Sequence, residues 1–505
     1  MKFIILLIVF FIFIFYFISN KKKTFTNNNN NSEIHFITLW SNNKDSENNI
    51  YNEIKKINNA RIIKKIIINK KEIAELYKNV SSGGKNHIKS DYVTTYIIEV
   101  PNEYTQKPTS DNPKGELVNK YMYDLKVAAR NYDYKNYLLA HGSFNIKEAN
   151  EFFEKYYKYL GNFKNIDEIF NELNSNNFFY LYDRLDINKD DYFKNNNKDI
   201  NLITDSIPAM SFSLRQLKYS NKQYVKIDSL NKKLQIYLRN IEENYYPVNW
   251  LLDIKNNNSY IIKNNVKIPK SKNHFMIGLY HMFIHKNGKY NENKMNILNK
   301  YSKELNIDID LFNLINFLYD NNYKIKKPVD NGVQFYYNNF TKDSYKKNTF
   351  KIGNYYFYKF NNKEDYDNEL YIYSLLKDYN IMPKNYNTSD NNLLIQIENC
   401  GKVLRNLTKN EINNVKDYKE QISNIINKFK KHNLFHNDIH GENITINNKN
   451  KIYLIDFEHA KHINKPVSNM SVSTFPDNFN STNTFYEYIT TNVIIKCFNR
   501  FIKKS

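Results

Sequence analysis

The chain has 505 residues, a length that predicts about three domains of roughly 150 residues each. Its 43 tyrosines and 34 phenylalanines supply large apolar side chains, and its net charge is +21. The lysines are spread along the chain without a basic block or an aromatic RNA-binding signature, which argues against nucleic acid as a partner. With only Cys400 and Cys497, the sequence excludes a disulfide framework and a cysteine-based zinc site.

An apolar run, FIILLIVFFIFIFYFI from Phe3 to Ile18, opens the chain and is followed by three lysines. At about 1.5 Å per residue the run is slightly short for a bilayer core of ~30 Å, and we expect Tyr16 and the lysines to extend it by snorkelling. No small-residue cleavage site follows. The sequence therefore predicts an uncleaved single-pass membrane anchor at 1–20 and a low-complexity linker at 21–33. The bulk of the chain is expected on the cytoplasmic side.

Residues 34–170 are predicted to form an α/β domain. Three segments rich in isoleucine, valine, threonine and aromatic residues are typical of strands: 33–40, 61–69 and 92–100. A helical segment at 49–57 separates the first two. Another helix is expected from Asn145, which fits an N-cap because Glu148 follows three residues later. Polar residues between these elements form either a polar site or a solvated helix face and turn: Asn119, Asp124, Lys126, Arg130, His141 and Glu148.

Residues 171–330 form the next predicted region, which ends at the turn after Pro328. Two strands and a later helix carry its polar residues: Asp199, Asn201, Tyr237, Arg239, Tyr280, His281 and His285. The arrangement resembles nucleotidyltransferase-like proteins found with surface-glycan genes, in which an Asp-x-Asp strand precedes an Asp-x-Arg strand and a Tyr-His helix. Neutral residues stand where two-metal transfer needs carboxylates, so the resemblance implies a degenerate module. The alternative for the Tyr-His helix is ordinary packing.

From Gly332 onward, the features follow one another in an order that favours phosphotransfer chemistry. An alternating aromatic strand, NYYFYKF, carries Lys359 near its end, and the following helix carries Glu369. The next strand, NLLIQIENCG, contains Glu398. A helix from Glu411 then leads into FHNDIHGENITI, a turn, and the apolar strand of IYLIDFEHA.

This succession resembles the protein-kinase-like fold, and within it the choline kinase and aminoglycoside phosphotransferase families more than the protein kinases proper. The family's catalytic loop is His-x-Asp followed five residues later by Asn, matched here by His436, Asp438 and Asn443. Its metal-binding strand ends in Asp-Phe-Gly or Asp-x-Glu, matched by the Asp-Phe-Glu run that begins at Asp456. The resemblance covers 331–505 and implies a bilobal kinase-like domain, so that the expected fold class is α+β.

Phosphoryl transfer needs a group that orients the attacking hydroxyl, and it needs oxygen ligands for the Mg²⁺ that bridges the nucleotide phosphates. Asp438 fits the first role. Asn443 and Asp456 fit the second, because Mg²⁺ prefers hard oxygen donors.

The remaining site residues are assigned to nucleotide binding and to support. Lys359, paired with Glu369, would neutralise the α- and β-phosphates of ATP. Glu398 is placed with the nucleotide-binding residues. His436 is expected to brace the catalytic loop.

Several departures from the protein-kinase pattern bear on the acceptor. No G-x-G-x-x-G precedes Lys359, Asn437 stands where protein kinases have Arg, and no Ala-Pro-Glu follows Glu458. A small-molecule, lipid-linked or glycan hydroxyl is therefore the expected acceptor. The alternatives are a serine/threonine protein kinase and a pseudokinase or nucleotidyltransferase-like scaffold. Asn443-Ile444-Thr445 is also an N-glycosylation pattern, and a sugar there would obstruct the metal ligand, which favours a cytoplasmic location.

Overall fold

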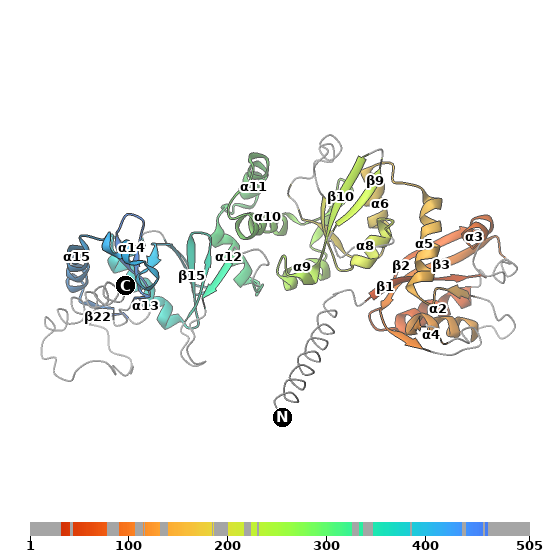
Figure 1. The fold of residues 1–505 in the computed structure, drawn as a ribbon, viewed down its shortest axis with the longest axis horizontal. Coiled ribbons are helices and arrows are strands. Elements are labelled where there is room, and N and C mark those ends of the chain that lie inside the picture. The colour runs from red at the N-terminus through yellow and green to blue at the C-terminus, as the bar shows by residue number, and fades with distance from the viewer. Residues whose placement is uncertain are drawn as a thin grey trace, which may run out of the picture. The chain divides into compact units, whose positions relative to one another are not determined.

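The computed structural model divides the chain into two compact units, which are described separately below (Figure 1). Unit 1 comprises Met1–Glu243 and Leu251–His274, and unit 2 comprises Asn244–Trp250 and Phe275–Ser505. The structure describes residues 32–462 apart from 41–43, 78–89, 107–114, 116, 132–139, 184, 186–199, 217–223, 230–231, 326–332, 337–346, 384–385, 437–440 and 458–459.

The predicted membrane anchor lies outside the described residues. Within the described part of the chain, no helix is both long enough and apolar enough to cross a bilayer. The predicted linker extends two residues too far, because Ser32 and Glu33 already belong to a strand and pair with Pro101 and Val100.

The first half of unit 1 is built on an antiparallel sheet of order β2-β3-β1-β6. Its strands are β1 (Ser32–Leu39), β2 (Arg61–Asn69), β3 (Tyr92–Pro101) and β6 (Ala140–Gly142). One face packs against α2 (Lys44–Lys56) and α4 (Lys120–Asn131), and the other against α3 (Lys70–Leu76) and α5 (Ile146–Leu160) (Figure 1). A short hairpin of β4 (Tyr104–Gln106) and β5 (Leu117–Asn119) precedes α4.

The predicted strands and helices of this region are confirmed, and the strands pair in an order that the alternation along the chain did not specify. The strands β1 and β2 are not neighbours, because both pair with β3, and both pairings are antiparallel. The cap of α5 is confirmed: the Asn145 side chain accepts a hydrogen bond from the backbone N–H of Glu148 at 2.9 Å.

The second half of unit 1 contains a mixed sheet of order β7-β8-β10-β9, in which β8 and β10 run parallel. Its strands are β7 (Tyr180–Tyr182), β8 (Ile200–Thr204), β9 (Tyr224–Ser229) and β10 (Lys232–Asn240). The helices α6 (Ile166–Ser175) and α8 (Ile207–Ser213) share one apolar core with this sheet. The 3-10 turn η2 (Ile241–Glu243), α9 (Val248–Asn256) and the hairpin of β11 (Tyr260–Lys263) and β12 (Val266–Pro269) follow.

Unit 2 combines a helical segment with a five-stranded antiparallel sheet of order β13-β14-β15-β17-β16. The helical segment contains α10 (Ser271–Tyr280), the π-helical turn η3 (His281–His285), α11 (Glu292–Leu305) and α12 (Leu311–Asp320). The sheet consists of β13 (Val333–Tyr336), β14 (Lys347–Ile352), β15 (Tyr355–Phe360), β16 (Tyr386–Ser389) and β17 (Leu394–Glu398), with α13 (Lys363–Leu376) between β15 and β16.

The last part of unit 2 packs around α15 and a hairpin. Its elements are β18 (Lys402–Val403), η4 (Leu404–Asn406), α14 (Lys409–Asn413), α15 (Tyr418–Lys431), β19 (Leu434–Phe435), β20 (Ile444–Ile446), β21 (Ile452–Leu454) and β22 (Lys461–His462). The predicted order of lysine strand, glutamate helix, third strand, helix and apolar strand is confirmed, but the single helix expected from Glu411 is divided into α14 and α15. The second predicted region is divided differently, because α11 and α12 belong to unit 2.

The abundant asparagines have a structural use in this fold. The chain contains only 11 glycines, and ten of the thirteen non-glycine residues with positive φ in the described part are asparagines. Asparagine tolerates the left-handed conformation better than most residues, so it replaces glycine in turns. Asparagine also caps helices, as Asn69, Asn165 and Asn362 do.

Candidate phosphotransfer site

Three ionisable side chains meet in unit 2: Lys347 at the start of β14, Glu369 on α13 and Asp456 after β21. The Lys347 ammonium lies 3.3 Å from Oε2 of Glu369 and 2.5 Å from Oδ1 of Asp456. The side chains of Lys347 and Glu369 are 4% and 0% exposed, whereas that of Asp456 is 23% exposed. Burying an unpaired charge costs several kcal/mol, on the order of the stability of a small domain, so these groups depend on one another.

The predicted pairing of Lys359 with Glu369 is wrong. The Lys359 ammonium donates a hydrogen bond to the carbonyl oxygen of Phe360 at 3.3 Å and lies 5.7 Å from the ring centroid of Tyr319 on α12. Side chains alternate along a strand, and Phe360 packs into the core that β15 shares with α13, so its neighbour Lys359 points to the opposite face. Lys347 stands directly opposite Phe360 in the β14–β15 register and therefore faces α13.

The helix that carries Glu369 is capped at its N-terminus and packs through a buried face. Asn362 caps α13 by accepting a hydrogen bond from the N–H of Asp365 at 2.8 Å. The buried face follows the helical repeat through Tyr366, Glu369, Ile372, Tyr373 and Leu376. Oε1 of Glu369 accepts a hydrogen bond from the N–H of Phe457 at 3.3 Å. Glu369 thus fixes both the lysine of the sheet and the backbone that follows Asp456.

The two predicted metal ligands leave the same end of one hairpin. The strands β20 and β21 pair with Ile444 opposite Leu454, and the N–H of Ile455 donates to the carbonyl oxygen of Asn443 at 3.1 Å. Asn443 therefore precedes β20 beside the position from which Asp456 follows β21. Asp456 has φ +69°, a left-handed conformation that costs about 1 kcal/mol or more in a non-glycine residue and that is often found at functional sites.

A carboxylate and an amide are a donor set that suits Mg²⁺. No group of three or more His, Cys, Asp or Glu side chains able to hold a metal occurs among the residues that the structure describes. Mg²⁺ is typically bound through one or two carboxylates together with substrate phosphates and water, so the pair of Asn443 and Asp456 fits it without further protein ligands.

The histidine of the predicted catalytic loop lies against the strand that is predicted to end in a metal ligand. Nε2 of His436 is 3.1 Å from the carbonyl oxygen of Ile455, and its ring centroid is 5.1 Å from that of Phe457. His436 is 2% exposed, so it makes the contacts that a bracing role requires. The predicted catalytic Asp438 lies in the stretch 437–440, outside the described residues.

A glycine missed by the sequence reasoning joins the sheet to the hairpin. Glu398 ends β17 half-buried. Gly401 follows with φ +118°, and a Cβ atom at this position would lie 2.1 Å from the carbonyl oxygen of Ile446 on β20. Only glycine fits this contact.

Cys400 lies between Glu398 and Gly401 in the sequence. Burial and the charge of Glu398 raise the pKa of its thiol to about 12, which makes the thiol unreactive.

The polar set predicted in unit 1 does not converge on one site. Asn119 donates to Glu33 at 2.9 Å, and Glu33 lies 2.7 Å from Nε2 of His35. Nδ1 of His35 is 2.8 Å from Oγ of Ser143. This serine, histidine and glutamate arrangement resembles a hydrolase triad, but Ser143 is 1% exposed and His35 is 0% exposed, so no substrate reaches it. It is a buried polar network that ties β1 to the segment after β6.

The other members of that set act locally. The Lys126 ammonium lies 3.4 Å from the ring centroid of Phe144. Burial lowers the pKa of Lys126 to about 8, and the charge of Glu148 offsets only part of this effect. The His141 ring packs against that of Tyr77 at 5.1 Å. Asp124 is exposed on α4, and the side chain of Arg130 lies outside the described part of the structure.

The residues that resemble a degenerate nucleotidyltransferase motif lie only partly within the described part of the chain. Asn201 on β8 stands opposite Tyr237 on β10, and Arg239 lies two residues further along the same face. Asp199 lies outside the described residues. The later helix shows the packing alternative: the side chain of Tyr280 is buried among aromatic rings, Nδ1 of His281 lies 2.7 Å from the Tyr290 hydroxyl, and Nε2 of His285 lies 2.8 Å from the carbonyl oxygen of Tyr245.

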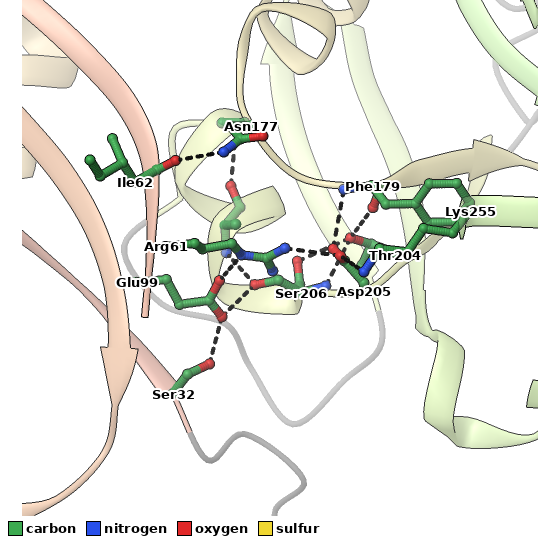
Figure 2. A network of polar contacts seen from close by, with 12 residues as sticks. Ser32, Arg61, Ile62, Glu99, Asn177, Phe179, Thr204, Asp205, Ser206 and Lys255 are labelled. Atoms are coloured by element: carbon green, nitrogen blue, oxygen red, sulfur yellow. Dashed lines mark hydrogen bonds and ion pairs between the residues drawn. The ribbon is translucent and has the colours of Figure 1, made fainter. Parts of the chain in front are cut away.

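A charged network connects the two sheets of unit 1. Figure 2 shows the Arg61 guanidinium between two carboxylates, with Nε 2.6 Å from Glu99 and Nη1 2.9 Å from Asp205. Lys255 adds a second cation 2.8 Å from Asp205, and the Ser206 hydroxyl donates to Glu99 at 2.7 Å. Burial alone would raise the pKa of Asp205, but Arg61 and Lys255 outweigh it and hold this pKa below its usual value.

We expect Asp205→Asn to reduce the free energy of unfolding of unit 1 by about 1–3 kcal/mol at pH 7, because it removes a charge that two cations neutralise. A carboxylate with a lowered folded pKa stabilises above its unfolded pKa of about 4, and this contribution is lost as the pH falls through the folded value. The difference between wild type and variant in urea unfolding should therefore shrink below about pH 4. A difference that stays constant from pH 7 to pH 3 would contradict this assignment.

One described surface cavity of about 480 Å³ lies away from the site. It is lined by α15, the residues after α13 and the β20–β21 turn, and its lining includes Asp417, Lys428 and Lys451. Acidic and basic groups are mixed there, which gives the cavity no clear charge preference.

No family model matches the chain, and no curated protein matches it. Among solved structures, the chain is similar to the kinase PK-1 of Cydia pomonella granulovirus, with 14% sequence identity and a TM-score of 0.23. The match covers 34% of this chain and 69% of the viral protein. At this level of similarity, the support for a function comes from the geometry of unit 2 and not from the likeness.

Proposed function

We propose that unit 2 is an ATP- and Mg²⁺-dependent phosphotransferase that transfers the γ-phosphoryl group to the hydroxyl of a small-molecule, lipid-linked or glycan acceptor. The observation that carries this proposal is the buried Lys347–Glu369 pair, which contacts Asp456 beside Asn443. A cation, its buried counter-ion and two hard oxygen donors at one place are the parts that phosphoryl transfer requires.

Each described residue has a distinct role in this proposal. Lys347 supplies the positive charge for the nucleotide phosphates, and Glu369 holds the lysine in place. Asn443 and Asp456 hold Mg²⁺, which neutralises charge on the phosphates during transfer. Positioning and charge neutralisation provide most of the catalysis in this chemistry, so rigid support of these groups matters more than their number.

The acceptor side of the proposal rests on sequence. Asp438, in the His-x-Asp loop, is proposed to orient the attacking hydroxyl. Asn437 replaces the arginine of protein kinases, and no Ala-Pro-Glu motif follows Glu458, which favours a small acceptor over a protein. With the apolar segment 3–18 as an anchor, the enzyme would work at a cytoplasmic membrane surface.

Nucleotide-dependent thermal stabilisation tests the proposal. Because a ligand at 100 times its Kd stabilises the folded state by about 2.7 kcal/mol, ATP with Mg²⁺ is expected to raise the Tm of the wild type by several degrees. Asp456→Ala should remove the part of the shift that depends on Mg²⁺. Absence of a shift under both conditions would contradict nucleotide binding, whereas a shift without phosphoryl transfer to any acceptor would identify a scaffold in place of an enzyme.

A further inference from the structure

We propose that the surface cavity of about 480 Å³ in unit 2 is a second binding site, which takes a neutral sugar unit. Its volume lies in the range of about 300–1,000 Å³ that is usual for small-molecule sites. None of the four residues proposed to hold the nucleotide and Mg²⁺ lines it. The cavity is therefore separate from the phosphotransfer site, and sugar binding there can be tested whether or not unit 2 transfers a phosphoryl group.

The cavity has three walls, which are α15, the turn between β20 and β21, and the segment that follows α13. Gln421 on α15 joins the first two: its Oε1 accepts a hydrogen bond from the N–H of Ile452, and its Nε2 donates to the carbonyl oxygen of Asn450, both at 2.9 Å. The N–H of Leu454 donates to the carbonyl oxygen of Ile381 at 3.0 Å, which joins the third wall to β21. Because the walls are connected in this way, the cavity is formed before a ligand arrives and binding requires little reorganisation.

Each wall contributes one exposed asparagine to the lining: Asn380 after α13, Asn424 on α15 and Asn450 in the turn. In the part of the chain that the structure describes, none of these three side chains forms a hydrogen bond with another residue. An amide group both donates and accepts hydrogen bonds, as a hydroxyl group does. The three asparagines therefore offer partners to the hydroxyl groups of a sugar from three sides.

The charged side chains of the lining argue against a simple ion as the ligand. Asp378 and Asp417 line the cavity together with Lys428, Lys449 and Lys451. An anion would meet the two carboxylates, and a cation would meet the three ammonium groups. A zwitterion would use the charged groups and leave the asparagines without partners. The hydroxyl groups of a neutral sugar donate to the carboxylates and accept from the ammonium groups, so a sugar uses the whole set.

A small apolar surface completes the site. The half-buried ring of Tyr379 and the side chain of Ile425 belong to the lining. The Tyr379 hydroxyl lies 2.9 Å from Nε2 of His432 at the end of α15, and the Lys428 ammonium lies 4.5 Å from the Tyr379 ring centroid, so the ring is held in place. The C–H groups of a sugar ring can pack against such a surface while its hydroxyl groups bind the polar side chains.

Saturation-transfer difference NMR of the full-length chain, in a detergent without a sugar headgroup, tests the proposal. The probes are neutral hexoses, N-acetylhexosamines and their disaccharides. We expect at least one probe to bind with a dissociation constant on the order of 1 mM, because an open cavity supplies only a few hydrogen bonds. Absence of binding by every probe would overturn the proposal.

A pair of variants on one helix locates the bound sugar. Asn424→Ala is expected to weaken binding at least about fivefold, since it removes an amide partner. The matched control is Asn427→Ala, which changes an exposed asparagine of α15 outside the lining and should leave the affinity unchanged. The double variant Asp378→Ala/Asn424→Ala should weaken binding at least about twentyfold. Equal affinities in the wild type and all three variants would place the sugar elsewhere and refute the assignment.

Competition experiments test the choice of a neutral ligand. Inorganic phosphate, ethanolamine and glycine represent an anion, a cation and a zwitterion, and we expect none of them to displace the sugar at an equal concentration. Displacement by any of the three would show that a charged ligand fits the cavity better than a sugar does.

Asp456→Ala separates this site from the proposed phosphotransferase. The variant is expected to bind the sugar as tightly as the wild type while it loses phosphoryl transfer. Sugar binding that persists in a protein without phosphoryl transfer to any acceptor would uphold the sugar site and refute the proposed function. Sugar binding that is lost in Asp456→Ala would place the sugar at the phosphotransfer site and overturn the second site.

Discussion

Lys347→Met is expected to lower the rate of phosphoryl transfer by at least about a hundredfold, the usual effect of removing one preorganised charge-stabilising group. The same substitution at Lys359 is expected to change the rate by less than about threefold, because that lysine contacts Phe360 and Tyr319 and not the Glu369–Asp456 pair. Steady-state turnover of ATP with a responsive acceptor measures both variants.

The comparison distinguishes two assignments of the phosphate-binding lysine. The order of motifs along the chain places it at Lys359, whereas the register of β14 and β15 places it at Lys347. Circular dichroism should first show that both variants are folded. Loss of activity in Lys359→Met with retained activity in Lys347→Met would return the role to Lys359 and contradict the structure-based assignment.

Gly401→Ala is expected to destabilise unit 2 by more than about 3 kcal/mol. The added methyl group would meet the carbonyl oxygen of Ile446 at 2.1 Å, and that oxygen belongs to a β20 backbone that is paired on both sides. Relief of this clash would require the β17–β18 connection to move away from the hairpin that carries Asn443.

A matched substitution separates the contact from the backbone conformation. Gly288 also has positive φ, at +77°, but nothing lies within 4 Å of its Cβ position. Gly288→Ala should therefore cost only about 1 kcal/mol, the strain of a left-handed alanine. Urea unfolding of wild type and the two variants gives both values. Similar losses of unfolding free energy for the two substitutions would mean that the close contact between residue 401 and the carbonyl oxygen of Ile446 does not affect stability.

The order of elements in unit 2 was predictable from sequence because each element has its own local pattern. An alternating aromatic strand, a helix that carries Glu369 and an apolar strand ending in Asp-Phe are visible without knowledge of their partners. The pairing partner of Glu369 was not visible in this way, since it depends on which face of β15 meets α13. Lys359 and Phe360 are neighbours in sequence, so their side chains lie on opposite faces of β15. The lysine that faces α13 is Lys347, which lies on β14.

Unit 1 shows the same limit at the level of the sheet. The first three strands were predicted, yet their antiparallel order follows from long-range pairing that local alternation does not specify. The charged network in Figure 2 joins Arg61 to Asp205, 144 residues later, and no spacing rule connects such positions. Many of the asparagines occupy turn positions with positive φ or cap helices, and these positions can be identified only from the fold.

The central claim is that unit 2 transfers a phosphoryl group through a site built on Lys347, Glu369, Asn443 and Asp456. Its most direct test is transfer of the γ-phosphoryl group of ATP to panels of sugars, amino alcohols and proteins, with wild type and Asp456→Ala measured side by side. The account predicts Mg²⁺-dependent transfer to a small hydroxyl acceptor that is lost in Asp456→Ala. Transfer that is equally fast in the variant, or the absence of transfer to every acceptor, would contradict it.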